Sequence, residues 1–200
     1  MLESHSQKFN RVDATSEKNP DRLLRNSDRI QIKFGNYNID IIENTSRIRV
    51  SKLYSTYQGL KTNRTFAVVA YPEVVDTAFA KEHKAIIDGQ SIGVVFELNG
   101  WTIDKHHLYF GEIEVPADDS GSHSLFGVNT PRPAMHIYSL VVRKDNASFV
   151  YALIAEIHHP EFLQLSDLKA IYGHDNTDTP QDSRIVHDFL GIVRNKIQSL

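Results

Sequence analysis

The sequence of 200 residues contains no cysteine. Disulfide bonds, zinc sites built on thiolates and thiol nucleophiles are therefore excluded. No uninterrupted apolar run has the length needed to cross a bilayer. The first residues also lack the apolar core of a secretory signal peptide. We therefore expect a cytoplasmic protein without a membrane span.

An excess of basic residues is also missing. Lysine and arginine together number 22, aspartate and glutamate 25, and the formal net charge is -3 at pH 7. A nucleic-acid-binding surface is therefore not expected. Apolar residues make up 40% and charged residues 24% of the chain, which is typical of a globular domain. The length is sufficient for one large domain with a substantial core.

Several common catalytic and cofactor motifs are absent. The sequence contains no nucleophile elbow of the GxSxG type, no phosphate-binding glycine loop, no dinucleotide-binding fingerprint and no HExxH zinc motif. We therefore predict no cofactor, and any function must be inferred from individual polar residues placed on the fold.

Apolar and polar residues alternate early in the chain, which is typical of β-strands with one buried face. Ile30, Ile32 and Phe34 alternate with polar neighbours, and the same period recurs between residues 39 and 50. The segment 65–71, TFAVVAY, is almost entirely apolar and predicts a strand that is buried on both faces.

Glycines mark the ends of two predicted helices in the middle of the chain. Gly89 ends the segment 74–88 and Gly100 ends the segment 91–99, as glycine often does at a helix C-terminus. The later elements are predicted as a strand at 101–115, a loop at 116–133, a hairpin at 135–158, and helices at 166–172 and 183–197. This order predicts an α+β fold with an antiparallel sheet and helices packed against it.

The ten histidines raise the hypothesis of a metal site. One of the pair His106 and His107, together with His136 and one of the pair His158 and His159, would supply three ligands, as zinc requires. The spacing of these residues matches no known ligand pattern. Surface or hydrogen-bonded histidines are the favoured interpretation, so we predict no metal.

Arg64 and Glu156 are the other candidates for chemistry. Arg64 stands where an apolar strand begins, and Glu156 lies near the end of the last apolar strand. A guanidinium group binds a carboxylate through two parallel hydrogen bonds. If both side chains face one cavity, they form a site with a cation at one end and an acceptor at the other. Alternatively, they pair with each other or lie in solvent.

A series of features resembles the chorismate pyruvate-lyase family in order and spacing. The features are the opening segments DRLLRNSD and IKFGNYNIDIIEN, a strand–turn–strand at 46–69 with Arg64-Thr65 opening its second strand, a short helix at 91–96, a strand from Thr102 to Gly111, and a return strand with Glu156 four residues before Pro160. The similarity runs from about residue 19 to residue 163.

The resemblance implies a six-stranded antiparallel sheet with helices packed on one side and an enclosed cavity for an aromatic ligand. It implies that Arg64 holds the ring carboxylate, that Glu156 meets the hydroxyl group at the para position, and that the backbone at Ile92 and Gly93 contacts the ligand. Lys105 occupies the place of a family arginine and is a further candidate for binding the substrate. The implied activity is a cofactor-free lyase that releases pyruvate from chorismate and leaves a hydroxybenzoate, with Arg64 and Glu156 as catalytic residues.

Some features depart from the family. Lysine binds as a point charge where the family has a planar fork, and the arginine-rich start of the penultimate strand is replaced by the segment 135–138. We therefore divide the chain into a flexible arm at 1–18, a chorismate lyase-like domain at 19–163, and a C-terminal helical extension at 164–200. The helix at 183–197 is expected to pack on the sheet or to form a dimer contact.

Two other functions stay open beside the lyase. The ligand-sensing UTRA domains of bacterial regulators share the family's fold, so a non-catalytic module that binds a small aromatic acid is the main alternative. A histidine-based metalloenzyme is the weaker one. In the first two cases the partner is a small aromatic or chorismate-like carboxylate, and the protein is a monomer or homodimer.

Overall fold

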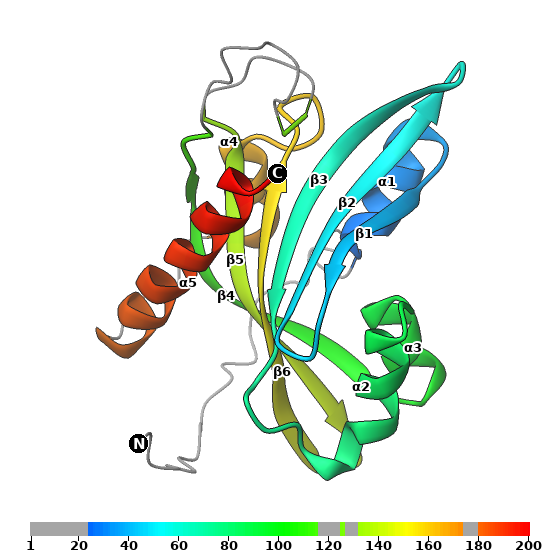
Figure 1. Ribbon diagram of the computed structural model, residues 1–200, viewed down its shortest axis with the longest axis vertical. Helices are drawn as coiled ribbons and strands as arrows, with labels where there is room; N and C mark the ends of the chain where they lie inside the picture. Colours follow the sequence, from blue (N-terminus) through cyan, green and yellow to red (C-terminus); the bar gives the residue numbers. More distant parts are fainter. Residues whose placement is uncertain (1–23, 116–124, 127–131, 174–179) are drawn as a thin grey trace.

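The computed structural model describes residues 24–115, 125–126, 132–173 and 180–200 (Figure 1). The arm predicted at residues 1–18 and most of the loop predicted at 116–133 lie outside the described residues.

The centre of the fold is a six-stranded sheet with the strand order β1-β2-β3-β6-β5-β4, in which all neighbours are antiparallel. The strands are β1 (Asn38–Asn44), β2 (Ile48–Tyr57), β3 (Leu60–Ala70), β4 (Thr102–Glu112), β5 (Ala134–Lys144) and β6 (Ala147–His158). Each half of the sheet is a three-stranded meander, and the pairing of β3 with β6 joins the two halves.

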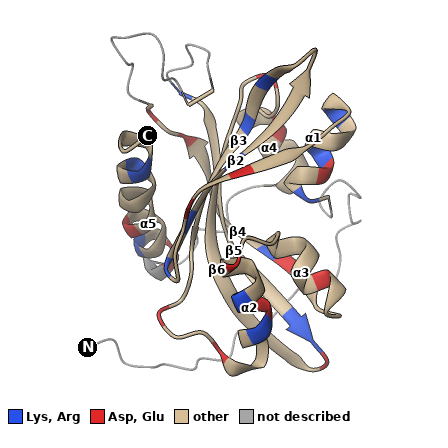
Figure 2. Ribbon diagram, turned by 45° about the vertical axis from the view of Figure 1, so that its right-hand side comes forward, with Lys and Arg blue, Asp and Glu red and all other residues tan. Residues whose placement is uncertain are grey.

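Helices cover the sheet. They are α1 (Asn26–Phe34), the 3-10 helix η2 (Thr77–Phe79), α2 (Ala80–Ile87), α3 (Ile92–Leu98), α4 (Leu165–Tyr172) and α5 (Pro180–Gln198). Figure 2 shows α1 to α4 together on one side of the sheet, whereas α5 lies against the other side. The predicted α+β fold class, a six-stranded antiparallel sheet with helices packed on one side, is confirmed, and α5 from the predicted extension adds cover to the second face.

Alternation along β3 explains why both faces are covered. Phe66 and Val68 belong to the apolar cluster that includes α5, whereas Ala67 and Val69 belong to clusters with the helices on the opposite face. Successive side chains of a strand point to opposite faces, so a strand this apolar needs a partner on each side. The prediction that the segment 65–71 is buried on both faces agrees with this arrangement.

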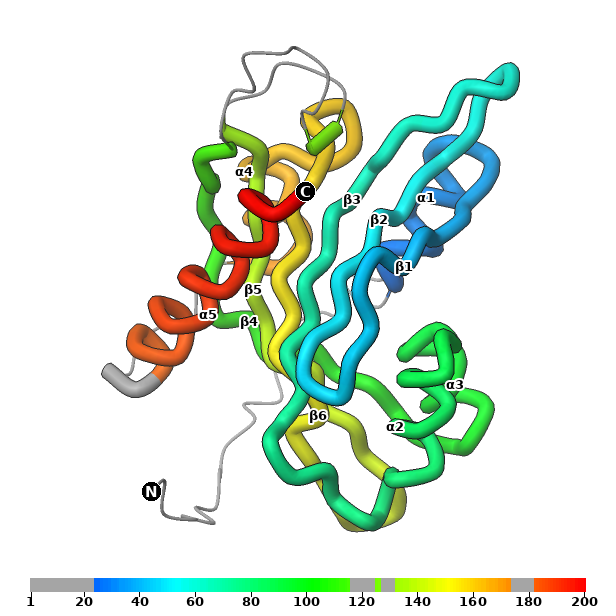
Figure 3. Tube along the Cα trace, viewed as in Figure 1, coloured from blue at the N-terminus to red at the C-terminus, as the bar shows by residue number. Residues whose placement is uncertain are grey.

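The chain leaves β3 and passes through η2, α2 and α3 before it enters β4 at the far edge of the sheet (Figure 3). Asp76 caps η2, since its side chain accepts a hydrogen bond from the backbone N–H of Ala78 at 2.8 Å. Gly89 and Gly100 follow α2 and α3 with φ angles of 107° and 77°. These left-handed angles favour glycine, and they account for the predicted ends of both helices.

The strand expected around Ile30, Ile32 and Phe34 is wrong, because these residues form α1. Ile30 is fully buried while Ile32 is 71% exposed, so the two side chains do not share a face. Gly35 ends the helix with a φ of 82°. Ile30 is the residue that anchors the helix in the core, and the alternation of apolar and polar residues from Ile30 to Phe34 does not reflect a strand.

In the described residues, no helix combines the length and the apolar character needed to cross a membrane.

The C-terminal helix α5 packs on the sheet, which is one of the two arrangements expected for it. Its buried residues are Val186, Phe189, Val193 and Ile197. Their spacing of three or four residues forms one stripe. This stripe contacts the side chains of β3, β5 and β6 that point away from α1 to α4.

We expect the substitution Phe189→Ala to lower the free energy of unfolding by about 3–5 kcal/mol, because a phenyl ring that is 2% exposed would leave a cavity between α5 and the sheet. The control is Ile192→Ala on the same helix. Ile192 is 37% exposed, so its loss should cost less than about 1 kcal/mol. Urea unfolding measures both. Equal effects would show that α5 does not form part of the core.

Candidate functional site

A β-bulge determines the direction of Arg64. In the pairing of β2 with β3, Leu53 lies opposite Thr65 and Tyr54 lies opposite Asn63, so Arg64 is an extra residue on β3. Strict alternation would point Arg64 away from the face that Thr65 occupies, but a bulge re-aims the extra side chain. Arg64 therefore lies on the face covered by α1.

The contacts of the Arg64 guanidinium confirm this direction. It lies 3.7 Å from the ring centroid of Phe34 in α1, and its Nε donates to Ser55 Oγ at 2.9 Å. Both contacts are on the helix-covered face. The side chain is 10% exposed and is held in one orientation by an aromatic ring and a hydroxyl group.

The carboxylate partner of Arg64 is Glu161, whose Oε2 lies 3.2 Å from Arg64 Nη1. The Glu161 side chain is 71% exposed. Its backbone N–H donates to His159 Nδ1 at 3.1 Å. An ion pair with such an exposed partner stabilises by only about 0–1 kcal/mol. A ligand carboxylate could therefore take the place of Glu161 on Arg64 at a small cost.

Glu156 lies on the same face as Arg64 but has a different partner. Its neighbours across the strands are Ala67 on β3 and His136 on β5. Glu156 is 7% exposed, and its Oε2 lies 3.8 Å from Lys105 Nζ. Arg64 and Glu156 therefore do not pair with each other. Each has its own counter-ion.

The pKa of Lys105 reflects this pairing. Burial by itself lowers the pKa of a lysine, but the Glu156 carboxylate and the nearby Tyr138 outweigh burial and raise the pKa of Lys105 above its ordinary value. The ammonium group also lies 4.5 Å from the ring centroid of Tyr138 and 5.8 Å from that of Tyr172. The raised pKa favours the charged form of Lys105, which suits this residue to bind an anion and not to act as a base.

A row of hydrogen-bonded polar residues separates Arg64 from Glu156. Thr65 and His158 are cross-strand partners, two pairs along from Ala67 and Glu156 and therefore on the same face of the sheet. Thr65 Oγ1 lies 3.2 Å from His158 Nδ1 and accepts a hydrogen bond from Asn26 Nδ2 at 2.9 Å. The helix α1 therefore contributes Asn26 to a polar layer that runs between the two predicted site residues.

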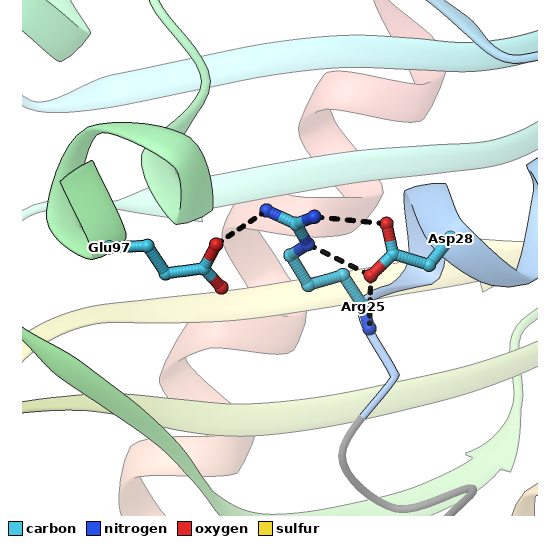
Figure 4. A network of polar contacts seen from close by, with 3 residues as sticks. All are labelled: Arg25, Asp28 and Glu97. Carbon is cyan, nitrogen blue, oxygen red and sulfur yellow. Dashed lines mark hydrogen bonds and ion pairs between the residues drawn. The ribbon is translucent and has the colours of Figure 1, made fainter.

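Ile92 and Gly93 are the first two residues of α3. A Cβ atom added at Gly93 would lie 3.0 Å from Cδ of Arg25. Arg25 forms ion pairs with Asp28 of α1 and Glu97 of α3, each at 2.9 Å, and so bridges the two helices (Figure 4). The structure thus places the predicted backbone contact beside this bridge, where glycine leaves room for the arginine side chain.

Two of the metal-site candidates contact each other directly. His107 Nδ1 and His136 Nε2 are 2.7 Å apart and share a hydrogen bond. Their rings stack with a centroid separation of 4.8 Å. The ring centroid of Tyr172 in α4 lies 4.7 Å from that of His107 and 4.9 Å from that of His136. His106 is exposed. Among the described residues, no group of three or more His, Asp or Glu side chains is arranged to hold a metal ion.

Two buried histidines next to Glu156, His136 and His158, have lowered pKa values. Burial, followed by the charge of Lys105, lowers the pKa of His136 well below its ordinary value. Burial also lowers the pKa of His158 to about 4, although the Glu156 carboxylate opposes this shift. Neutral imidazoles therefore lie beside the Lys105–Glu156 pair at physiological pH.

Some residues of this layer gave little signal in the sequence. Tyr172 and Asn26 come from helices far apart in the sequence, α4 and α1, which pack in the same apolar cluster on the sheet, and local patterns carry no information about such docking. His136 was considered only as a metal ligand. Its position opposite Glu156 depends on a β-bulge in the β5–β6 hairpin, because the register shifts between Leu140 and Val141. A turn near residue 145 without this bulge would place His136 opposite Ala155, so the sequence did not reveal the pairing.

Comparison with known proteins gives no assignment. No protein-family model matches the chain, and no curated protein matches it.

We expect the stability of the protein to fall as the pH decreases from about 6.5 to about 4. In this range the unfolded chain takes up a proton at His158 that the folded chain does not, and the loss should reach about 3 kcal/mol. The variant His158→Asn keeps a hydrogen-bonding atom near Thr65 but does not titrate. Its stability should therefore fall less over the same range.

Thermal or urea unfolding at several pH values measures the difference between the two proteins. The exposed His106, changed to Asn, serves as the control and should keep the pH dependence of the parent. If His158→Asn also keeps the full pH dependence, His158 is not a buried neutral histidine.

Proposed function

We propose that the chain binds a small aromatic carboxylate on the helix-covered face of its sheet and acts as a cofactor-free lyase on chorismate. The main support is the bulge that turns Arg64 toward the same face as Glu156. Both residues are buried, and both lie at the positions that the resemblance to the chorismate pyruvate-lyase family implies. Without the bulge, strict alternation would place the two side chains on opposite faces.

In this proposal Arg64 binds the ring carboxylate, and Glu156 accepts a hydrogen bond from the ring hydroxyl. Lys105 binds the second carboxylate of the substrate. The ether C–O bond breaks, the neighbouring ring carbon loses a proton, and the released enolpyruvate takes up a proton to become pyruvate. The ring becomes aromatic, so the protein has mainly to orient the substrate and stabilise the developing negative charge.

A non-catalytic module that binds the same ligand class is the second candidate. One observation favours it: Arg64 and Lys105 are cations that bind anions, and neither is a base able to remove the ring proton. The same contacts would serve a binding module that releases its ligand unchanged.

We expect pyruvate to form when the purified protein is incubated with chorismate. The substitution Arg64→Ala should lower the rate or the affinity ten- to a hundredfold, because a charge-assisted hydrogen bond contributes about 1.5–3 kcal/mol. The control is Arg143→Ala, since Arg143 is exposed and paired with Asp104 on the far part of β4 and β5. Coupled detection of pyruvate measures the rate.

If the folded protein binds hydroxybenzoates but releases no pyruvate, the lyase is wrong and the binding module stands. If neither aromatic acids nor chorismate bind, both functions are wrong. Thermal shift and calorimetry detect the binding.

We expect Glu161→Gln to tighten the binding of 4-hydroxybenzoate up to about fivefold, because the exposed Glu161 carboxylate competes with the ligand for Arg64 and such a pair is worth up to about 1 kcal/mol. Glu73→Gln is the matched control, because Glu73 is equally exposed and pairs with a different arginine, Arg47. Calorimetry would detect the change. Unchanged or weaker binding in Glu161→Gln would show that the ligand does not use this face of Arg64.

A further inference from the structure

Two ring nitrogens in the interior have no hydrogen-bond partner. They are His136 Nδ1 and His158 Nε2, and neither has a partner among the described residues. His136 is fully buried and His158 is 1% exposed. A buried polar atom without a partner costs about 1–3 kcal/mol, so native proteins rarely keep one without a reason.

The second nitrogen of each ring is engaged, and this fixes the direction of the first. His136 Nε2 shares a hydrogen bond with His107 Nδ1 at 2.7 Å, and His158 Nδ1 contacts Thr65 Oγ1 at 3.2 Å. Stacking against Phe110 at a centroid separation of 4.6 Å further holds the ring of His136. The unpartnered nitrogens are therefore held in place and cannot rotate to find water at the surface.

Both histidines lie next to Glu156 on the same face of the sheet. His136 is its direct neighbour on β5, and His158 follows two residues later on β6. The carboxylate also has capacity to accept further hydrogen bonds, since Lys105 Nζ is 3.8 Å away and thus beyond hydrogen-bonding distance. Three groups that lack a full set of partners therefore share one region under the helices.

We propose that His136 and His158, together with Glu156, form a subsite that binds a hydroxyl group of the ligand and selects hydroxylated rings over bare ones. This inference rests on the proposed binding of an aromatic acid through Arg64. A hydroxyl group donates one hydrogen bond and accepts others. It can therefore donate to Glu156 and accept from a ring N–H, whereas a carboxylate in this place would meet Glu156 as a like charge.

The histidines add selectivity that a carboxylate alone does not give. A site whose buried polar groups need a hydroxyl partner rejects the analogue that lacks it, because the groups are then left unpaired. The rings of Tyr138 and Tyr172 pack against His136 at centroid separations of 4.8 and 4.9 Å, so the subsite has aromatic walls. We therefore expect 4-hydroxybenzoate to bind at least tenfold more tightly than benzoate.

Calorimetry with benzoate and 4-hydroxybenzoate tests the subsite on the full-length chain. The variants His136→Phe and His158→Phe keep a ring but remove its nitrogens. In both variants the ratio of the two affinities is the measured quantity, and the preference for the hydroxylated acid should fall to about threefold or less. The exposed His106, changed to Phe, is the control and should keep the preference.

A second measurement needs no variant. In the parent protein with ¹⁵N-labelled histidine, 4-hydroxybenzoate or phenol should shift the ring-nitrogen resonances of His136 and His158, whereas benzoate should not. Phenol carries no carboxylate, so it tests the subsite independently of Arg64.

The outcomes separate the two proposals. If benzoate and 4-hydroxybenzoate bind equally well, the subsite is wrong while the carboxylate site stands. If neither acid binds but phenol shifts the two histidines, the proposed function fails and the subsite stands. If phenol and the hydroxylated acid leave both histidines unchanged, the two nitrogens hold a buried water only and the inference is overturned.

Discussion

The ion pair between Lys105 and Glu156 is the constraint on which the polar interior depends. It connects the edge strand β4 to the central strand β6, across β5, which lies between them in the sheet. Two charges removed from water are tolerated only as a pair, and loss of one partner leaves a costly buried charge. The positive charge of Lys105 in turn helps to keep the adjacent His136 neutral. The charge of Lys105 thus adds to the effect of burial on the neighbouring histidine.

Much of the fold could be predicted from the sequence because it is encoded locally. The hairpin of β5 and β6 was visible from two apolar segments around a turn at Asp145, and the ends of α2 and α3 were visible from glycines. The helix α1 was missed, because Ile30 and Ile32 alternate as they would in a strand. Which of them is buried depends on how the helix docks on β2, and no local pattern records that.

The sequence singled out Arg64 and Glu156 as candidate site residues, but it did not reveal how their side chains are oriented. Arg64 and Glu156 were identifiable as charged residues at the ends of apolar strands. The bulge that brings Arg64 to the face of Glu156 depends on the pairing of two strands, and one residue more or less would reverse the side chain. Similarly, each ion pair joins two residues that are far apart in the sequence, Lys105 with Glu156 and Arg64 with Glu161, so neither pair was foreseeable.

The way the sheet is assembled has a consequence for how the chain folds. Each three-stranded meander can form from contacts between neighbours in sequence, but the seam between β3 and β6 must wait for the last strand. Until then β3, whose second half at 66–70 is entirely apolar, is an open edge at which another chain could pair. During synthesis on the ribosome, the first meander would carry this exposed edge while most of the chain is still being made, so the protein should depend on chaperones or fast elongation to avoid aggregation.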